Sequence, residues 1–306
     1  MKNKKITIGS RGSKLAIIYA ERAKNTILNH LKINRENIVI KTITTDGDKI
    51  KDQRLSDTGG KGLFSKSIEK ELLENKIDIA VHALKDMTSN ETKGLITECF
   101  LKRNDPREVL ITINKKRFNE LAPGSVIGTS SFRREFQLKR IRSDLNFKLI
   151  RGNVDTRINK LSEKRFDAII LSLAGISLMK LDNYVSQIFS TSEIIPSAGQ
   201  GAIALQCREN DNETKKLLEK INHIPTSNCV KAERDVLKVL DGDCETPIGV
   251  NAQIKNNELV LEAELFSLDG RKRYYKKIST EFTEFKKIGM EIGEALKKES
   301  KNSYKK

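Results

Sequence analysis

The stretch Gly128-Thr-Ser-Ser-Phe-Arg-Arg134 follows the short apolar run Val126-Ile127 and precedes a helical pattern. This order predicts a strand, a tight turn and the beginning of a helix. Small residues in such a turn let backbone N–H groups point outward, and the N-terminus of a helix favours negative charge. Arginines add planar donor forks that suit carboxylates and phosphates. We therefore expect an anion site that includes Arg133 and Arg134.

The same order recurs at Arg151-Gly-Asn-Val-Asp-Thr-Arg157, after the apolar run from Phe147 to Ile150. Arg151 and Arg157 bring two further donor forks to this second turn. Few carboxylates lie beside these arginines in the sequence. We therefore expect their partner to be an anion from outside the chain. Arg11-Gly12-Ser13 repeats the arrangement between the first predicted strand and the first predicted helix.

Strands and helices alternate along the first hundred residues. The predicted elements are strands at 4–9, 37–45 and 77–82, a helix at 14–31 capped by Ser13, and a helix at 63–74, with a polar loop at 46–61. Alternation of this kind predicts a largely parallel sheet with right-handed crossovers.

A charged break at Lys102 to Pro106 precedes a second set of alternating strands and helices over 108–195. After another break, Pro196 to Gly201, we expect the strand at 202–207 to return to the first sheet. Beyond Asn210 two helices, three alternating strands with a turn at Leu268-Asp-Gly270 and a last helix predict an antiparallel sheet.

The predicted fold class is therefore α/β. Two lobes like those of periplasmic binding proteins, with mainly parallel sheets and a doubly crossed hinge, are followed by a small α+β domain with an antiparallel sheet. The predicted domains are 1–101 with 200–220, then 106–195, then 222–306.

Composition limits the classes of partner. The formal net charge is +16 and the pI about 9.6, but lysine is scattered along the whole chain, as expected for a solvated surface. A nucleic-acid binder would place basic residues among stacking aromatics, and aromatics are only 5% of this chain. The four cysteines form no C-x-x-C pair and only three histidines occur, so we expect no metal site. No apolar run suits a signal peptide or a membrane span, and the few cysteines favour a reducing cytoplasm.

Three positions could carry chemistry. Lys85-Asp86 follows a buried strand, at the edge of a parallel sheet where ligands bind, and it is either an acid–base pair or a helix cap with a solvated lysine. Lys61, in Gly59-Gly-Lys-Gly62, is either a ligand-binding cation or a mobile surface lysine. Cys244 lies in the turn-rich loop 241–247, and composition alone favours an inert loop cysteine over a covalent attachment point.

Eight segments, taken in order, resemble the hydroxymethylbilane synthase family, also called the porphobilinogen deaminase family. They are Arg11-x-Ser-x-Leu-Ala16, Gly59-Gly-Lys-Gly-Leu-Phe64, Asp78-Ile-Ala-Val-His-Ala-Leu-Lys-Asp86, Gly128-Thr-Ser-Ser-x-Arg-Arg134, Arg151-Gly-Asn-Val-x-Thr-Arg157, Asp167-Ala-Ile-Ile-Leu171 with Ala174-Gly175, Gly199-Gln-Gly-Ala202 and Gly242-x-Cys-x-x-Pro-Ile-Gly249.

The resemblance implies a transferase of porphyrin and heme biosynthesis. The family joins four porphobilinogen molecules head to tail with release of ammonia, and water then releases the linear tetrapyrrole. A dipyrromethane primer is held through a thioether, and by resemblance Cys244 is its attachment site. Asp86 is similar to the family's catalytic acid, which protonates the leaving amine and stabilises cationic intermediates. The partner is thus porphobilinogen and its growing oligomer, with no nucleic acid and no membrane, and the chain is expected to be a cytoplasmic monomer.

Further residues match those that hold the acetate and propionate groups, assist chain growth or cover the cleft. They are Arg11, Ser13, Lys61, Phe64, Lys85, Thr129, Ser130, Ser131, Arg133, Arg134, Arg151, Gly152, Arg157 and Gln200. Each pyrrole brings two carboxylates, and burying them unpaired would cost several kcal/mol per ion, so the resemblance requires a cation-rich cleft.

Four positions depart from the family pattern. Ala83 replaces a Ser, Asp57 a frequent Lys, Tyr19 a frequent Gln, and Leu178 an Arg. These departures touch single carboxylate contacts. The alternative to an enzyme is a two-lobed protein that binds a small anion without catalysis, which would need the arginines but neither Asp86 nor Cys244.

Overall fold

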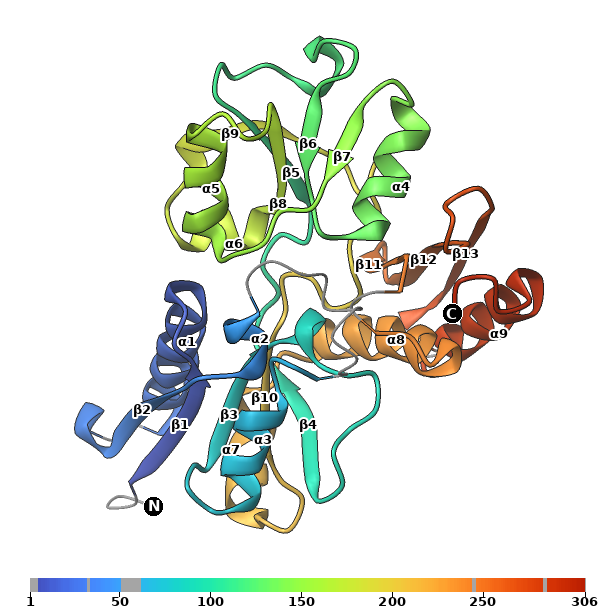
Figure 1. Cartoon of the computed structure of the whole chain (residues 1–306). Coiled ribbons are helices and arrows are strands. Elements are labelled where there is room, and N and C mark those ends of the chain that lie inside the picture. The colour runs from blue at the N-terminus through green and yellow to red at the C-terminus, as the bar shows by residue number, and fades with distance from the viewer. Residues whose placement is uncertain (1–4, 32–33, 51–61, 244–245, 283–284, 306) are drawn as a thin grey trace.

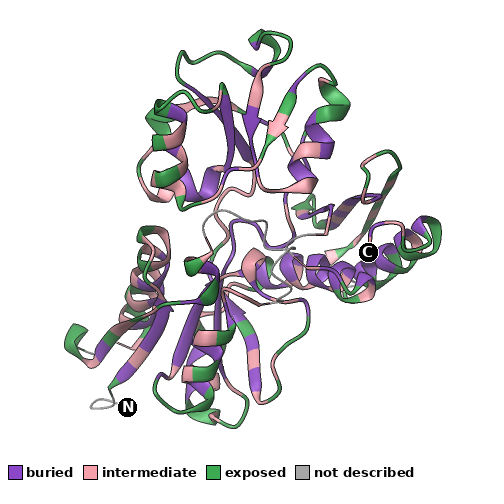
Figure 2. Ribbon diagram, viewed as in Figure 1, coloured by how far each residue is buried: buried purple, intermediate pink, exposed green. Residues whose placement is uncertain are grey.

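The computed structural model describes residues 5–31, 34–50, 62–243, 246–282 and 285–305 of the 306-residue chain. Two lobes, each built on a five-stranded sheet, lie one above the other in Figure 1, and a smaller unit with a three-stranded sheet lies beside them. Figure 2 shows that the strands at the centre of each lobe are mostly buried, as expected where helices cover a sheet.

The first lobe contains a sheet of order β2-β1-β3-β10-β4. Its strands are β1 (Ile6–Arg11), β2 (Ile38–Ile43), β3 (Ile79–Ala83), β4 (Leu95–Phe100) and β10 (Ile203–Arg208), and its helices are α1 (Lys14–Leu31), α2 (Asp46–Lys49), α3 (Lys66–Leu73) and α7 (Asn212–Ile221). Alternation along β3 sends Ile79 and Val81 to the face covered by α1 and α7, and Ala80 to the face covered by α3.

The second lobe contains a sheet of order β7-β6-β8-β5-β9. Its strands are β5 (Glu108–Thr112), β6 (Val126–Gly128), β7 (Asn146–Lys148), β8 (Ala168–Ser172) and β9 (Val185–Ile188), and its helices are α4 (Phe132–Ile141), α5 (Val154–Ser162) and α6 (Leu173–Leu178). Leu138 of α4 packs with Leu110 and Ile170 on one face, whereas Ile158 of α5 packs with Val109 on the other.

The predicted α/β class, with two lobes and a small antiparallel unit, is confirmed, and the sheets of both lobes are mixed. β1 pairs in parallel with β2 and β3, but β10 is antiparallel to β3 and β4, and β5 is antiparallel to β8 and β9. The reason is the double crossing between lobes. β5 and β10 each begin where the chain has just crossed, so they run away from the crossing, while β3, β4, β6 and β8 end near it. The predicted return of the chain to the first sheet is confirmed by β10.

The third unit is the antiparallel sheet β11 (Ile248–Lys255), β12 (Glu258–Phe266) and β13 (Arg273–Glu281), with α8 (Ile224–Leu240) and α9 (Ile288–Ser300) packed on one face. The predicted strands and hairpin are confirmed. Helix α8 begins earlier than the apolar pattern at Cys229 suggests, because the His223 side chain caps it by accepting from Thr226 N at 3.3 Å. The predicted domain boundaries stay predictions.

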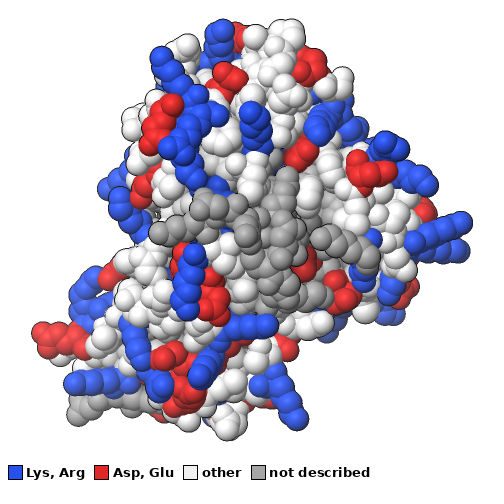
Figure 3. Space-filling model, in the orientation of Figure 1, with Lys and Arg blue, Asp and Glu red and all other residues white. Residues whose placement is uncertain are grey.

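The described residues contain neither a candidate membrane span nor a candidate metal site. None of their helices combines the length and the hydropathy of a membrane span. Their His, Cys, Asp and Glu side chains form no group of three placed to hold a metal ion. On the face drawn in Figure 3, lysine and arginine side chains are scattered and interspersed with acidic ones, which agrees with the interpretation of lysine as a general surface residue.

Candidate active site

The carboxyl ends of β1 and β3 bring Arg11 and Asp86 together. The two strands are parallel neighbours in register at Ile8 and Ile79, so they end at the same edge of the sheet. β3 passes into a single 3₁₀ turn, Leu84–Asp86, which places Asp86 beside Arg11, with Nη1 of Arg11 4.0 Å from Oδ2 of Asp86. Asp86 thus lies at the predicted edge of the sheet, and ligand binding at this edge stays a prediction.

Arg11 has two further neighbours. Asp48 of α2 accepts from Arg11 Nη2 at 2.5 Å, and the ring of Phe64 lies 4.1 Å from the guanidinium carbon. Burial raises the pKa of Asp48, but hydrogen bonds from Arg11 and Thr45 outweigh burial and hold this pKa below its ordinary value. A pocket opens beside these groups, lined by Arg11, Ser13, Leu15, Ala16, Tyr19, Phe64, Val81, His82, Ala83 and Asp86.

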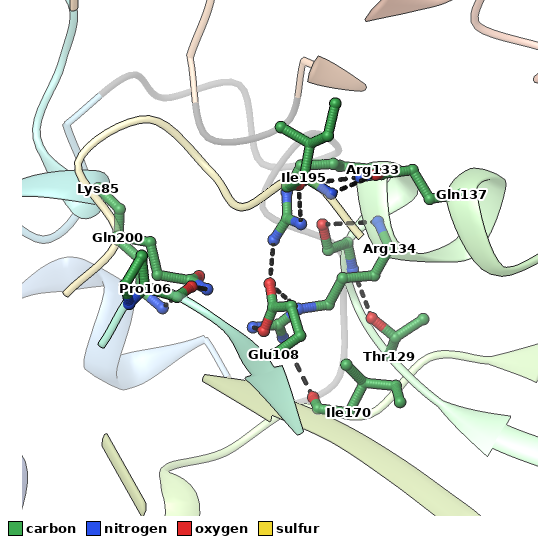
Figure 4. Close-up of polar contacts among 11 residues, drawn as sticks. Lys85, Pro106, Glu108, Thr129, Arg133, Arg134, Gln137, Ile170, Ile195 and Gln200 are labelled. Atoms are coloured by element: carbon green, nitrogen blue, oxygen red, sulfur yellow. Dashed lines mark hydrogen bonds and ion pairs between the residues drawn. The ribbon is translucent and has the colours of Figure 1, made fainter. Parts of the chain in front are cut away.

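One buried carboxylate forms ion pairs with both Arg133 and Arg134 of the second lobe (Figure 4). Glu108, at the beginning of β5, is 0% exposed, while Arg133 and Arg134 are 4% and 7% exposed. Glu108 accepts from Arg133 Nη2 at 2.7 Å and from Arg134 Nε and Nη2 at 3.0 and 2.8 Å. Burial raises the pKa of Glu108, yet the charges of Arg134 and Arg133 lower it to about 2.

This pairing corrects the expectation that the arginines meet only an anion from outside the chain. Local sequence could not show it, because Glu108 lies 25 residues before Arg133, at the beginning of β5. Carbonyl oxygens add to the pairing, since Arg134 Nη1 donates to Ile170 O at 3.1 Å and Arg133 Nη1 donates to Ile195 O at 2.9 Å. Each guanidinium has five N–H donors, more than these partners among the described residues take up.

The turn before α4 is built by its own hydroxyl groups. Thr129 Oγ1 accepts from Ser131 N at 3.1 Å, and Ser131 Oγ caps α4 by accepting from Arg134 N at 3.5 Å. Thr129 is buried, and Ser130 and Ser131 are half-buried. The turn therefore presents an ordered helix N-terminus beside the guanidinium groups.

The second turn crowds cations together. Gly152 adopts φ +115°, a conformation that side chains rarely allow, and its carbonyl accepts from Arg157 Nε at 2.8 Å. Burial, together with the charges of Arg134 and Arg151, lowers the pKa of Arg157 to about 10, while the charge of Asp86 opposes them. Arg157 therefore lies within electrostatic reach of Arg134, of Arg151 and of Asp86 in the other lobe.

Lys85 of the first lobe lies near charges of the second lobe and contacts one of the chain crossings. Burial lowers its pKa to about 8, the charges of Arg134 and Arg133 act in the same direction, and Asp86 and Glu108 oppose them. Its Nζ donates to Gln200 Oε1 at 3.4 Å, and the buried Gln200 donates from Nε2 to Pro106 O at 2.6 Å (Figure 4). Lys85 is thus hydrogen-bonded to Gln200 of the second crossing and is linked through Gln200 to Pro106 of the first.

Three predicted positions lie outside the described residues: Lys61, Asp57 and Cys244. On either side of residues 244–245, Thr246 N donates to Asp243 O at 3.2 Å, and Asp243 N donates to Thr246 Oγ1 at 3.0 Å. Ser13 lines the pocket and receives a hydrogen bond from Ala16 N at 3.3 Å, as a helix cap does.

The other departures from the family pattern have visible surroundings. Tyr19 is buried and lines the pocket, and burial and the charge of Asp86 raise the pKa of its hydroxyl. Ala83 lines the same pocket. Leu178 packs against the core of the first lobe, so its apolar side chain joins the lobes rather than facing the arginines.

Sequence reasoning missed two carboxylates of the site, Glu108 and Asp48. Only their positions in the sequence could have pointed to them as site residues. Glu108 directly follows the first crossing, and Asp48 lies in a polar segment shortly after β2. Both contacts form between segments that are separated in the chain, so local pattern could not reveal them.

Comparison with known proteins decides the family. A family model described as "Porphobilinogen deaminase, dipyromethane cofactor binding domain" matches residues 6–216, and "Porphobilinogen deaminase, C-terminal domain" matches residues 227–298. The chain belongs to the porphobilinogen deaminase family. The resemblance drawn from the eight segments is confirmed.

Curated relatives agree with this family. The chain is 41% identical to the porphobilinogen deaminase of Alkaliphilus metalliredigens over 95% of this chain and 92% of the relative. It is 42% identical to the enzyme of Geobacillus kaustophilus, over 90% and 88%, and 42% identical to that of Coxiella burnetii, over 97% and 95%. The chain is accordingly a transferase of tetrapyrrole biosynthesis with a dipyrromethane cofactor, and the alternative of a binding protein without catalysis is not favoured.

Solved structures similar to this chain include two-lobed binding proteins. An ancestral arginine-binding protein bound to arginine gives a TM-score of 0.40 at 16% identity, covering 72% of this chain and 92% of that one. The probable amino-acid transporter binding protein YtmK of Bacillus subtilis gives a TM-score of 0.42 at 14% identity, covering 72% and 92%. These values are too low to support any argument, so the two-lobed description depends on the sheets themselves.

Proposed function

We propose that the edge between the two lobes is the catalytic site of the family's reaction, with Asp86 as the catalytic carboxylate and the arginines as holders of the pyrrole carboxylates. The observation that supports this most is the meeting of charges from both lobes. Lys85 and Asp86 come from the first lobe, whereas Arg134 and Arg157 come from the second. The charge of Asp86 raises the pKa of Arg157, and the charge of Arg134 lowers the pKa of Lys85.

The donor set fits an anionic pyrrole chain. Arg133, Arg134, Arg157 and Lys85 are buried or half-buried cations, and Glu108 is the carboxylate at their centre. Burial, with the charges of neighbouring arginines, lowers the pKa values of Arg157 and Lys85, and the charge of an added carboxylate would favour both cations. Charge-assisted hydrogen bonds contribute roughly 1.5–3 kcal/mol each, so several are needed to offset the desolvation of each carboxylate.

Each residue then has a distinct task. Arg11 and Ser13, with the ring of Phe64, bind and orient a carboxylate-bearing pyrrole in the pocket beside Asp86. Arg133, Arg134, Arg151 and Arg157 hold the carboxylates of the chain under construction, assisted by the turn residues Thr129, Ser130, Ser131 and Gly152. Gln200 holds Lys85 in place. Lys61 would cover the cleft.

Asp86 acts on the amine. Its carboxylate is placed to hold the protonated aminomethyl group of porphobilinogen, so that the proton stays with nitrogen as the C–N bond breaks and ammonia leaves. The negative charge of Asp86 then stabilises the positive charge left on the substrate carbon. The bound dipyrromethane supplies the pyrrole carbon that is the nucleophile for the first substrate.

We also propose that Cys244 is the attachment residue, on the family pattern Gly242-x-Cys-x-x-Pro. The predicted domains, 1–101 with 200–220, 106–195 and 222–306, then divide the work among substrate activation, carboxylate binding and tethering. A reducing cytoplasm is supported by the free thiols of Cys99, Cys207 and Cys229, and the monomer stays part of the proposal.

Two variants test the proposal. Asp86→Asn should keep its fold and the intact mass of the primer but release ammonia at least about 100-fold more slowly, the range of one lost acid–base group. Cys244→Ser should fold and lack the mass of two linked pyrrole units. Normal turnover by Asp86→Asn would remove this residue from catalysis, and a primer still attached in Cys244→Ser would move the attachment site.

A further inference from the structure

A buried carboxylate joins the second lobe to the third unit. Glu264 lies on β12 and is 2% exposed. It accepts from Nη1 of Arg140, on α4, at 2.5 Å and from Nε of Arg273, on the neighbouring strand β13. One carboxylate therefore pairs with an arginine of its own sheet and with an arginine of the helix that begins at the cleft.

Aromatic rings reinforce this contact. The ring of Phe136 on α4 lies 5.7 Å from that of Phe266 on β12 and 5.6 Å from that of Phe132. Gly270, in the turn between β12 and β13, adopts φ +72°, and a Cβ there would lie 2.7 Å from the Phe136 ring. Only glycine lets the hairpin approach α4 so closely. In Figure 1, α4 lies directly above the region of β11 and β12.

The other end of the same helix carries the arginines of the site. Arg133 and Arg140 are seven residues apart, which is about two turns and roughly 10 Å along one helix face. Gln137, between them, donates to Ile195 O at 3.0 Å and accepts from Ile195 N at 2.6 Å. Burial lowers the pKa of Arg133, the charge of Glu108 raises it, and so does the charge of Glu264, which places Glu264 within electrostatic reach of the cleft.

The third unit also carries the segment next to the proposed attachment loop. Phe266 N donates to Pro247 O at 3.0 Å, and Pro247 directly precedes β11. The strand that binds α4 through Glu264 and Phe266 is thus hydrogen-bonded to the end of the loop 241–247. Hydrogen bonds therefore connect Pro247, through β12, to the helix that carries Arg133 and Arg134.

We propose that Glu264 is a positioning residue for the cofactor site. It sets the position of α4 against the sheet and so holds Arg133 and Arg134 at the distance that the tethered pyrroles require. This inference rests on the proposed function of those arginines. Glu264 touches neither substrate nor cofactor. Its effect passes through Arg140 and helix α4 to the arginines of the site. A purely structural ion pair would change stability without changing KM.

The experiment compares four variants of the full-length chain. Glu264→Gln and Arg140→Met break the pair to α4, whereas Arg273→Met breaks only the pair within the sheet, and Glu262→Gln on the same strand is the matched control. The readouts are KM and kcat for porphobilinogen, the fraction of protein that carries the primer by intact mass, and the thermal midpoint.

We expect Glu264→Gln and Arg140→Met to raise KM about fivefold and to lower the primer-bearing fraction, with kcat within about twofold, the size of effect of one partly buried pair. Arg273→Met and Glu262→Gln should leave KM within about twofold. Equal effects of Arg273→Met and Arg140→Met on KM would overturn the inference. The contact between Glu264 and α4 would then matter for KM no more than the contact within the sheet.

Arg134→Leu separates the two proposals. A raised KM in Arg134→Leu together with an unchanged KM in Glu264→Gln refutes the positioning role and leaves the proposed function standing. An unchanged KM in Arg134→Leu refutes the proposed role of the arginines themselves.

Discussion

Replacing Glu108 by Gln should destabilise the protein more than any exposed substitution. The carboxylate is 0% exposed and accepts three hydrogen bonds from Arg133 and Arg134, at 2.7, 3.0 and 2.8 Å. Glutamine keeps the shape and one acceptor but leaves two buried guanidinium groups without a counter-charge. Breaking a buried pair in this way costs about 3–5 kcal/mol.

The pKa of Glu108 gives a second route to the magnitude. A carboxyl whose pKa falls from 4.5 to about 2 on folding contributes about 3 kcal/mol at neutral pH, at about 1.4 kcal/mol per pKa unit. Because the pKa is lower in the folded state, this contribution is complete above the unfolded value of 4.5 and is lost as pH falls toward 2. The two routes agree on about 3 kcal/mol.

Urea unfolding at a series of pH values measures this contribution. At pH 7 the free energy of unfolding of Glu108→Gln should be lower than that of the unchanged chain by about 3 kcal/mol, and the difference should shrink as pH falls below about 4.5. Glu120→Gln, at an exposed position, serves as the control. A deficit below about 1 kcal/mol at pH 7, or one that stays constant down to pH 3, would refute the reasoning.

Two further predictions concern cations of the cleft, and a third concerns the glycine of the second turn. Lys85 has a pKa of about 8, so it loses its charge as pH rises from about 7 to 9; KM for porphobilinogen should rise over that range, and Lys85→Arg should abolish the rise. A KM that rises equally in Lys85→Arg would assign the pH dependence to another group. Arg157→Met should raise the thermal midpoint in the Cys244→Ser background, because burial and the charges of Arg134 and Arg151 disfavour the charged guanidinium. In the enzyme that carries the primer, the same substitution should raise KM. A lower thermal midpoint would contradict this prediction. Gly152→Ala should cost about 1 kcal/mol or more of stability, since its φ of +115° is unfavourable for alanine and its Cβ would lie 2.6 Å from Thr156 Cγ2, and an unchanged unfolding curve would disprove the strain.

Several features followed from local pattern. Strand-to-helix turns at Arg11, Gly128 and Arg151 were visible because apolar runs, small residues and helical spacing are encoded within about ten residues. The return of β10 to the first sheet followed from a break and an apolar run. The antiparallel hairpin β12–β13 followed from alternation and the turn Leu268-Asp-Gly270. Eight ordered motifs were enough to indicate the family, which the comparisons confirm.

The direction of β5 and β10 was not visible in the sequence. A strand has the same alternation whether its neighbour runs with it or against it, so the mixed sheets depend on where the chain crosses between lobes. Leu178 likewise gave no local sign that it packs against the other lobe.

The sequence by itself determined which residues are candidates for the chemistry: a Lys-Asp pair after a buried strand, four arginines at turns of the second lobe and a cysteine in a polar loop. Only the tertiary structure decided their charges and partners. Glu108 pairs with Arg133 and Arg134, Asp48 binds Arg11, and Glu264 binds the far end of α4, each across a long stretch of chain. The physical reason is that turns and helices form from neighbours in sequence, whereas electrostatic pairing depends on distance in space, which folding alone sets.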